Sequence, residues 1–317
     1  MFWARLATGL LAALALIGIF GPRDRLRTDG QGAPPPGDVQ AWLDRREAGI
    51  DPEVASRLHW ADRPGAMTEV AILYLHGFSA SPGELRPLPE RLAERLGANL
   101  LAMRLTGHGT DGRDLARARA QDWWHDLAQG LAAAGRLGRR VVVIGMSMGG
   151  TLAALGARDP RLGRMMAGVV LISPNFGLRR RDRWLLDLPL ARPVLRLLGD
   201  PERCFPVRND LHRRRWTSCY PLSAALAVGA LLRQAGRGDY RAASAPALFI
   251  WSDADRIVDH AASARVAAKW GGGATVAKLT VGPRDDPDAH VIAGDALSPG
   301  LTRHLVPRIA AWIDALR

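Results

Sequence analysis

A serine flanked by glycines stands at Gly145-Met146-Ser147-Met148-Gly149, directly after the apolar run 141–144 and at the start of a helical pattern. A strand, a sharp turn and a helix around a serine form the setting of a nucleophile elbow, which raises the hydroxyl above the carboxyl edge of a sheet. Small residues two positions before and after the serine let strand and helix pass closely. We therefore expect Ser147 to be a nucleophile. The alternative is a glycine turn that only packs a helix against a sheet.

A serine hydroxyl needs a base to take its proton, and a carboxylate must orient that base. Four histidines follow Ser147 in the chain. We expect His290 to be the base, because it occupies a loop just after a predicted strand, at the sheet edge where Ser147 emerges. His212 precedes any plausible acid, His260 begins a predicted helix and His304 lies inside the last one.

Two carboxylates, Asp253 and Asp255, follow the apolar run 247–251 and so lie at the same sheet edge. We favour Asp255 as the acid, because a carboxylate just before an apolar turn can bend back toward a histidine. The chain between Asp255 and His290 has room for one helix and one strand. Three further carboxylates share the loop of His290 and are expected to be solvated turn residues: Asp285, Asp286 and Asp288.

Acyl transfer also needs hydrogen-bond donors where negative charge develops on oxygen, each of which contributes about 100- to 1000-fold in rate. The backbone N–H of Met148 begins the helix after the elbow and is one candidate. The loop after residues 70–75 offers the second at Phe78, because Gly77 allows a tight turn there. His76 precedes the nucleophile and is expected to be a structural, hydrogen-bonded residue.

Strand and helix patterns alternate along the rest of the chain. A capping box at residues 81–84 predicts the start of a helix that Gly97 ends. Alternating strands and helices imply a doubly wound, mostly parallel sheet. The predicted strands are 70–75, 99–105, 141–144, 169–172, 247–251 and 275–280, and the predicted helices are 81–96, 123–137, 148–155, 260–270 and 301–316.

The stretch 174–245 interrupts this alternation with apolar segments between arginine-rich turns, which predicts a mainly helical insertion that caps the sheet. It holds 14 arginines and 6 acidic residues, a net charge of +8 out of +12 for the chain. The clusters 179–183 and 213–215 suggest that the cap faces an anionic bilayer. Alternatively, an arginine-rich genome places these side chains on an ordinary solvated face.

The N-terminus contains an uncharged apolar run at residues 6–20. Residues 2–22 reach the length of a membrane-spanning helix, so we expect an uncleaved anchor over 1–27, in a bacterial inner membrane. A cleaved signal peptide and a buried helix are the alternatives. The Pro- and Gly-rich residues 28–38 read as a linker to the body, 39–317. Arginines stand on both sides of the apolar run, so its orientation is open.

The composition, 317 residues with 48% hydrophobic and 23% charged side chains, is that of a globular chain. No nucleic-acid-reading motif accompanies the positive charge, so no nucleic-acid partner is expected. No P-loop, dinucleotide fingerprint or zinc spacing appears, so neither a cofactor nor a metal is expected, including at His108. Cys204 and Cys219 are most simply two buried thiols, because one bridge would need an oxidising compartment.

Five ordered motifs resemble the α/β-hydrolase superfamily, in particular its bacterial carboxylesterase and monoacylglycerol lipase branch: HGFSAS (76–81), RLTGHGT (104–110), GMSMGG (145–150), SDADRIV (252–258) and DAHVI (288–292). The resemblance covers about residues 57–317. It departs from the family at Asp288-Ala289, where relatives often have Ser-Gly.

The resemblance implies an α/β-hydrolase fold with a cap over 174–245. It also implies a triad of Ser147, Asp255 and His290, with Phe78 and Met148 as the oxyanion hole. The implied activity is hydrolysis of a small acyl ester or lipid through an acyl-enzyme. An acyltransferase, an amidase or a peptidase could use the same triad, and a membrane-tethered binding protein could keep the fold without catalysis.

Overall fold

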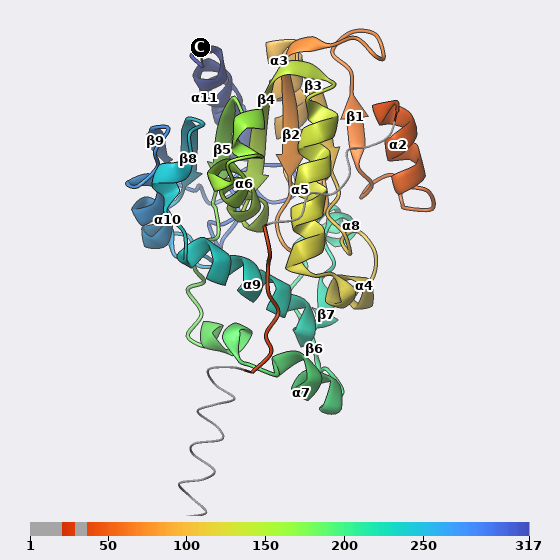
Figure 1. The fold of residues 1–317 in the computed structure, drawn as a ribbon, viewed down its shortest axis with the longest axis vertical. Coiled ribbons are helices and arrows are strands. Elements are labelled where there is room, and N and C mark those ends of the chain that lie inside the picture. Colours follow the sequence, from red (N-terminus) through yellow and green to blue (C-terminus); the bar gives the residue numbers. More distant parts are fainter. Residues whose placement is uncertain (1–20, 29–36, 317) are drawn as a thin grey trace, which may run out of the picture.

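A computed structural model describes residues 21–28 and 37–316 of the chain. Its centre is a seven-stranded sheet in the order β1-β3-β2-β4-β5-β8-β9 (Figure 1). The edge strand β1 runs antiparallel to β3, and every other neighbouring pair in this sheet is parallel. The strands are β1 (Arg57–His59), β2 (Thr68–Leu75), β3 (Asn99–Met103), β4 (Gly138–Met146), β5 (Gly168–Ile172), β8 (Ala247–Trp251) and β9 (Ala274–Lys278).

The central strands are buried on both faces, as their continuous apolar runs predict. Along β2, Leu73 and Leu75 belong to one hydrophobic core, whereas Ile72 and Tyr74 belong to another on the opposite face. All four side chains are fully buried. Two cores, one on each face, therefore hold the sheet between layers of helices.

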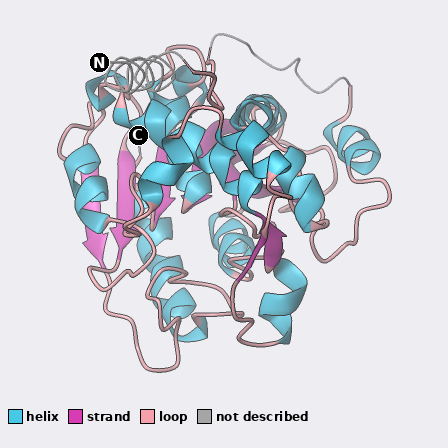
Figure 2. Ribbon diagram, turned by 90° about the horizontal axis from the view of Figure 1, so that it is seen from below, coloured by secondary structure: helices cyan, strands magenta, loops and turns pink. Residues whose placement is uncertain are grey.

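Helices cover both faces of the sheet (Figures 1 and 2). Trp123 of α5 and Leu152 of α6 enter one core, and Leu92 of α3 and Ile309 of α11 enter the other. This arrangement is the doubly wound α/β-hydrolase architecture that the sequence predicts. The helices outside the cap are α2 (Val39–Arg46), α3 (Leu88–Leu96), α4 (Gly112–Arg117), α5 (Ala120–Ala134), α6 (Met148–Arg158), α10 (His260–Ala267) and α11 (Pro299–Asp314).

The first helix after β2 begins later than its capping box predicts, at Leu88 instead of at residues 81–84. In a capping box, the Glu84 carboxylate would return to the N–H of Ser81. It accepts instead from the N–H of Gly77 and the hydroxyl of Tyr74. The hydrogen bonds of Glu84 to Gly77 and Tyr74 thus replace the capping-box bond to the Ser81 N–H, and residues 82–87 form turns instead of a helix.

The insertion 174–245 is mainly helical, as expected, and consists of α7 (Ala191–Leu197), α8 (Asp210–Arg215), α9 (Ala225–Gly236) and short 3₁₀ turns. It also contains a two-stranded hairpin, β6 (Glu202–Cys204) and β7 (Cys219–Pro221), that the sequence did not predict. A disulfide joins Cys204 to Cys219 across this hairpin, and both residues are exposed. The expectation of two buried free thiols is therefore wrong.

Residues 21–28, which the sequence divides between anchor and linker, run in extended form along the cap and α5. The Leu26 side chain is buried, and the Pro22 carbonyl accepts a hydrogen bond from the Leu190 N–H at 2.8 Å. These residues belong to the folded body, so an anchor would have to end before residue 21. Within 21–28 and 37–316, no helix has the length and apolar character to span a bilayer. Of the predicted anchor, 1–27, residues 1–20 lie outside the described chain.

Candidate active site

Ser147 stands between β4 and α6 with a left-handed backbone, φ 49° and ψ −113°. Its N–H donates to the Ile172 carbonyl at 2.9 Å. The turn needs glycine on both sides. A Cβ at Gly145 would lie 2.5 Å from the Gly149 oxygen, and one at Gly149 would lie 2.3 Å from the Leu75 oxygen. The backbones of the strand and the helix are therefore in direct contact at these glycines. This packing holds Ser147, with its strained backbone, at the carboxyl end of β4.

Three residues predicted from the sequence form one hydrogen-bonded chain. Ser147 Oγ lies 2.9 Å from His290 Nε2, and His290 Nδ1 lies 2.8 Å from Asp255 Oδ2. A carboxylate only accepts, so Nδ1 carries the proton and Nε2 is left to accept from the serine hydroxyl. The structure therefore places Ser147, His290 and Asp255 in the geometry that an activated serine requires.

The Asp255 carboxylate is fully buried and fully bonded. Its Oδ1 accepts from the N–H groups of Ile257 and Val258, at 2.8 and 2.9 Å, which leaves Oδ2 for His290. Asp253, the other candidate, points elsewhere, because it bonds the Trp251 indole and Lys278 at the surface. Of the two carboxylates at this edge, only Asp255 contacts the histidine.

Opposing effects act on the pKa of His290. Burial lowers the pKa, but the carboxylates of Asp255, Asp286 and Glu84 outweigh burial and leave the pKa above its ordinary value. The imidazolium that forms when His290 takes a proton is thus favoured by the site, as a general base requires.

Among the described residues, the backbone N–H groups of Phe78 and Met148 donate to no acceptor. These are the two donors predicted from the sequence. Gly77 brings the first of them close, since a Cβ on Gly77 would lie 3.4 Å from Ser147 Cβ. Two unpaired N–H groups next to a nucleophile can receive the charge of an oxyanion.

Glu84 is a fully buried carboxyl group beneath this loop that sequence reasoning missed. Its Oε2 accepts from the Gly77 N–H at 2.7 Å and from the Tyr74 hydroxyl at 3.1 Å. Burial raises the pKa of Glu84 to about 7, against the lowering effects of Gly77, Tyr74 and His290. The sequence feature that could have pointed to this role is Glu84 itself, the glutamate of the predicted capping box, which the pattern places at the start of a helix.

Asp286 is a second residue whose role was missed. We expected it to be a solvated turn residue, but it is buried, and its Oδ2 accepts from the N–H groups of His290 and Val291. Ala289, which precedes the histidine, has a left-handed backbone with φ 53°. Asp286 thus holds the His290 loop in a conformation that alanine seldom adopts.

His76 has the structural role that the sequence predicts. Its Nε2 accepts from the Leu105 N–H at 3.0 Å, so its Nδ1 is protonated and donates to the Gly77 carbonyl at 2.8 Å. Burial lowers the pKa of His76 well below its ordinary value and lowers that of His108 to about 4. Both rings are neutral packing residues. In the described chain, no group of three or more His, Cys, Asp or Glu residues could hold a metal ion.

The cap closes over this site. The Tyr220 ring packs edge-on against the Phe78 ring, with centroids 5.2 Å apart, and the Thr217 N–H donates to the Ser79 carbonyl at 2.7 Å. Only 7% of Ser147 remains exposed. Cap residues therefore touch the loop that carries the Phe78 N–H group.

Comparison with known proteins agrees with this architecture. A family model described as the alpha/beta hydrolase family matches residues 72–303. A thermostable monoacylglycerol lipase of Bacillus sp. (strain H-257) is 37% identical over 83 residues, which are 26% of this chain and only a third of that relative's length.

Solved structures show the same fold at low sequence identity. One comes from work on LipS and LipT, two metagenome-derived lipolytic enzymes. It has 21% identity and a TM-score of 0.64, over 84% of this chain and 99% of that chain. The monoacylglycerol lipase of Paleococcus ferrophilus has 16% identity and a TM-score of 0.61, over 83% and 98%. At these identities the likeness concerns the fold alone.

Proposed function

Because the chain belongs to the alpha/beta hydrolase family, we propose that it is a serine hydrolase that cleaves carboxylic esters through an acyl-enzyme. The observation that carries the proposal is the hydrogen-bonded chain from Ser147 through His290 to Asp255, with links of 2.9 and 2.8 Å. All three groups are buried, so the geometry is maintained by packing as well as by hydrogen bonds.

In the proposed mechanism, His290 Nε2 takes the proton of Ser147 while Oγ attacks the acyl carbon. Asp255 stabilises the imidazolium, and the N–H groups of Phe78 and Met148 bind the oxyanion. Collapse of the tetrahedral intermediate expels the alcohol, which receives the proton from His290. Water then repeats the sequence on the acyl-enzyme, releases the carboxylic acid and restores the serine.

We propose an acyl ester of lipid character as the substrate class. The printed names of the similar proteins, a monoacylglycerol lipase and lipolytic enzymes, support this class. Rates on glycerol monoesters of increasing acyl length would define the preference.

A fluorophosphonate probe tests the nucleophile directly. The full chain should be labelled once, and Ser147→Ala should remain unlabelled, because the probe reacts only with an activated serine. Ser173→Ala is a matched control, since Ser173 is also buried with a left-handed backbone but lies outside the hydrogen-bonded chain. Equal labelling of Ser147→Ala would overturn the proposal.

We further propose that residues 2–20 anchor the protein in a bacterial inner membrane, with the catalytic domain on its oxidising side. The disulfide between Cys204 and Cys219 supports this side, because exposed cysteine pairs are kept reduced in the cytosol. Mass spectrometry of the N-terminus and maleimide labelling of the native chain test the two parts. A mature chain that begins near residue 21 would contradict the anchor. Two thiols that react with maleimide would contradict the placement on the oxidising side.

A further inference from the structure

Exposed apolar side chains gather on one part of the cap. The described chain exposes ten large apolar side chains, and six of them lie within residues 184–198. Soluble monomers seldom expose such a contiguous group unless it binds something. We name this group the apolar tip; it consists of Trp184, Leu185, Leu188, Val194, Leu197 and Leu198.

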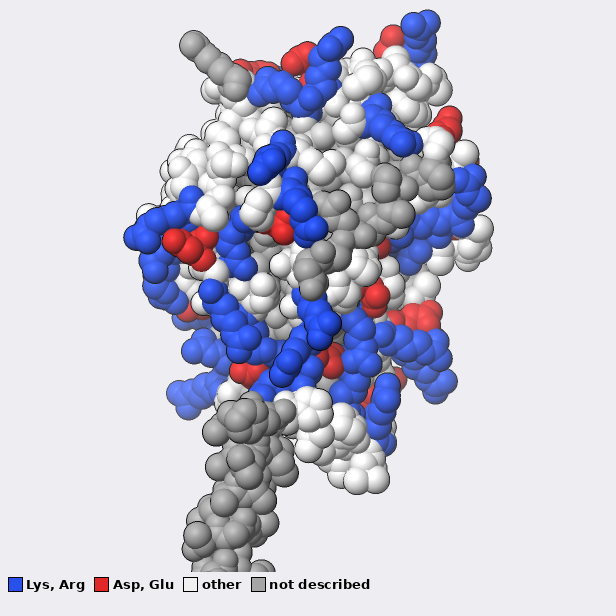
Figure 3. Space-filling view, in the orientation of Figure 1, with Lys and Arg blue, Asp and Glu red and all other residues white. Residues whose placement is uncertain are grey.

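The apolar tip lies at one end of the molecule. Its residues belong to the 3₁₀ helix Arg183–Asp187, the following turn, and α7 with its C-terminal end. Figure 1 shows α7 at the lower end of the body, and Figure 3 shows uncharged atoms there. Leu197 and Leu198 are 88% and 69% exposed, so the described chain leaves most of these two side chains uncovered.

Cationic side chains surround the apolar tip. Arg181, Arg183 and Arg196 are exposed, and no carboxylate among the described residues pairs with them. Two acidic residues lie within residues 181–198: Asp182 pairs with Arg180, and Asp187 pairs with Arg23 and Arg233. Figure 3 shows a belt of Lys and Arg just above the uncharged end. The tip is thus apolar with a positive rim.

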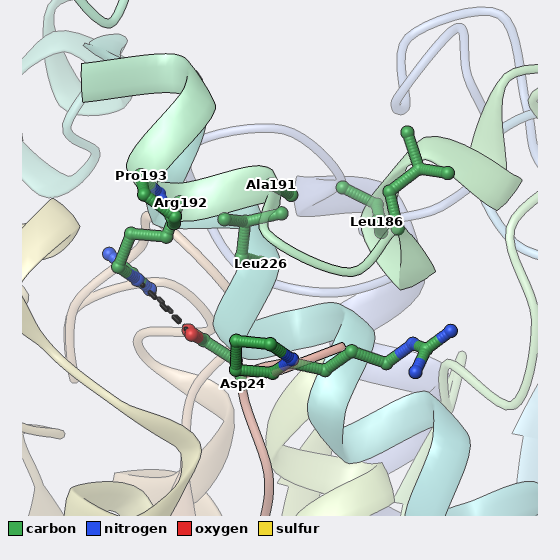
Figure 4. Close-up of a pocket in the computed structure, with 9 residues that line it drawn as sticks. Asp24, Leu186, Ala191, Arg192, Pro193 and Leu226 are labelled. Atoms are coloured by element: carbon green, nitrogen blue, oxygen red, sulfur yellow. Dashed lines mark hydrogen bonds and ion pairs between the residues drawn. The ribbon is translucent and has the colours of Figure 1, made fainter. Parts of the chain in front are cut away.

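The N-terminal residues are fixed beside the same elements. Asp24 pairs with Arg192 of α7 and, at 2.9 Å, with Arg119, as the dashed line to Arg192 in Figure 4 illustrates. Pro22 and Asp24 line a cavity of about 170 Å³ together with Leu186 and Leu226. The apolar sequence 6–20 therefore joins the body at the cap segment that carries the apolar tip.

We propose that the apolar tip docks on the surface of a bilayer that contains anionic lipids. Trp184 and the leucines would enter the interface, where tryptophan is favoured, and the rim arginines would meet lipid phosphates. A symmetric contact with a second copy is disfavoured, because it would bring two sets of unpaired arginines together. The proposal is independent of the esterase chemistry.

Only one of the two arginine clusters noted in the sequence takes part. In the 213–215 cluster, Arg215 is buried against Glu53 and Arg213 pairs with Asp210. Their helix α8 lies well above α7 in Figure 1. The docking surface therefore includes arginines of the 179–183 cluster but not those of the 213–215 cluster.

Site-specific fluorescence tests the docking. The full-length chain, with its disulfide intact, receives one added cysteine by Leu197→Cys and a polarity-sensitive label, and Met67→Cys provides a control on another exposed apolar residue. The probe vesicles are equal parts phosphatidylcholine and phosphatidylglycerol. Emission at position 197 should move to shorter wavelength and be quenched by spin-labelled lipid, whereas emission at position 67 should not change.

Three outcomes would overturn the proposal. Emission at 197 that stays as it is in buffer would show that the tip remains in water. Equal shifts at 197 and 67 would indicate non-specific adsorption. A shift that needs no vesicles and grows with protein concentration would assign the tip to a second copy.

A charge substitution gives a second readout, which rests on the proposed function. Leu197→Glu combined with Leu198→Glu should slow hydrolysis of a long-chain monoester dispersed in the same vesicles about tenfold, without slowing hydrolysis of a water-soluble short ester. Met67→Glu is the control and should alter neither rate. Equal rates for the double variant and wild type on the vesicle substrate would contradict docking, whereas absence of turnover on both substrates in wild type would contradict only the proposed function.

Discussion

The Glu84 carboxyl group accepts a hydrogen bond from the N–H of Gly77 at 2.7 Å, one residue before the Phe78 amide that we assign to the oxyanion hole. This contact orients the peptide that precedes the donor. Because Gly77 has no side chain, the carboxyl group approaches within the space that a Cβ would occupy. A buried acid therefore supports the side of the site where negative charge would develop.

Replacement of Ser147 or His290 by alanine should lower turnover of short acyl esters by about 1000-fold or more, because each belongs to one catalytic unit. His304→Ala is the matched control, since His304 is exposed on α11. Steady-state kinetics and circular dichroism together check the prediction. Retention of a tenth of the wild-type rate by either folded variant would refute the triad.

Asp255→Asn should lower kcat at least about 100-fold, because the amide leaves His290 without its carboxylate partner. Asp253→Asn should change kcat less than about twofold, since the partners of Asp253 are Trp251, His260 and Lys278 and not His290. Parallel kinetics on the two variants decide between the carboxylates. A greater loss in Asp253→Asn would transfer the acid role to that residue.

Glu84 makes the stability of the protein depend on pH. Its folded pKa, about 7, is higher than its ordinary value, so the unfolded chain releases this proton first and stability falls as pH rises from about 4.5 to 7. Glu84→Gln cannot ionise and should remove this decline, on the order of 3 kcal/mol between pH 5 and pH 8. Urea unfolding of both proteins at the two pH values measures the difference. A difference in stability between them that does not vary with pH would contradict the assignment.

Asp286→Asn should shift the ascending limb of the pH profile of kcat/KM to lower pH. The wild-type limb should have its midpoint above 6.5, because neighbouring carboxylates raise the pKa of His290, and Asp286 is one of them. Asp288→Asn is the control on the same loop, since Asp288 pairs with Arg208 at the surface. Profiles of the two variants that coincide with each other would argue against an electrostatic role for Asp286.

Removal of residues 1–20 should leave short-ester turnover unchanged, because every residue of the proposed site lies between residues 77 and 290. Removal of residues 1–37 should lower Tm, since it takes Asp24 from the buried Arg192, and loss of a buried partner costs about 3–5 kcal/mol. Thermal unfolding of the two shortened chains makes the comparison. Equal Tm values would show that the Asp24 pairs do not stabilise the cap.

The placement of a side chain can be predicted from the sequence where a local pattern has one structural solution. The glycines around Ser147 permit only a close strand-to-helix turn, and the loops of Asp255 and His290 follow strands that end at the same sheet edge. Prediction failed for Glu84 and Asp286, whose partners depend on tertiary packing that no local pattern encodes. The motif at residues 81–84 fits a capping box, but it also fits the buried contact of Glu84 with Gly77 and Tyr74 that the structure shows.

The disulfide was also beyond local inference. Spacing does not say whether Cys204 and Cys219 meet, because their pairing requires β6 and β7 to lie side by side within an irregular insertion. Residues 21–28 were likewise assigned by composition to a membrane segment and a linker. Two of their partners, Leu190 and Arg192, are more than 160 residues away in the chain.

The contact between the Phe78 and Tyr220 rings couples the loop beside Ser147 to strand β7 of the cap. Phe78 supplies a main-chain donor toward Ser147 and a side chain toward the cap, while Tyr220 follows directly after the bridged Cys219. A molecule that binds the cap and moves β7 would change the free energy of the loop that carries Phe78, the residue that we propose for the oxyanion hole. By linkage, a tetrahedral adduct on Ser147 must alter the affinity of the cap for that molecule by the same factor.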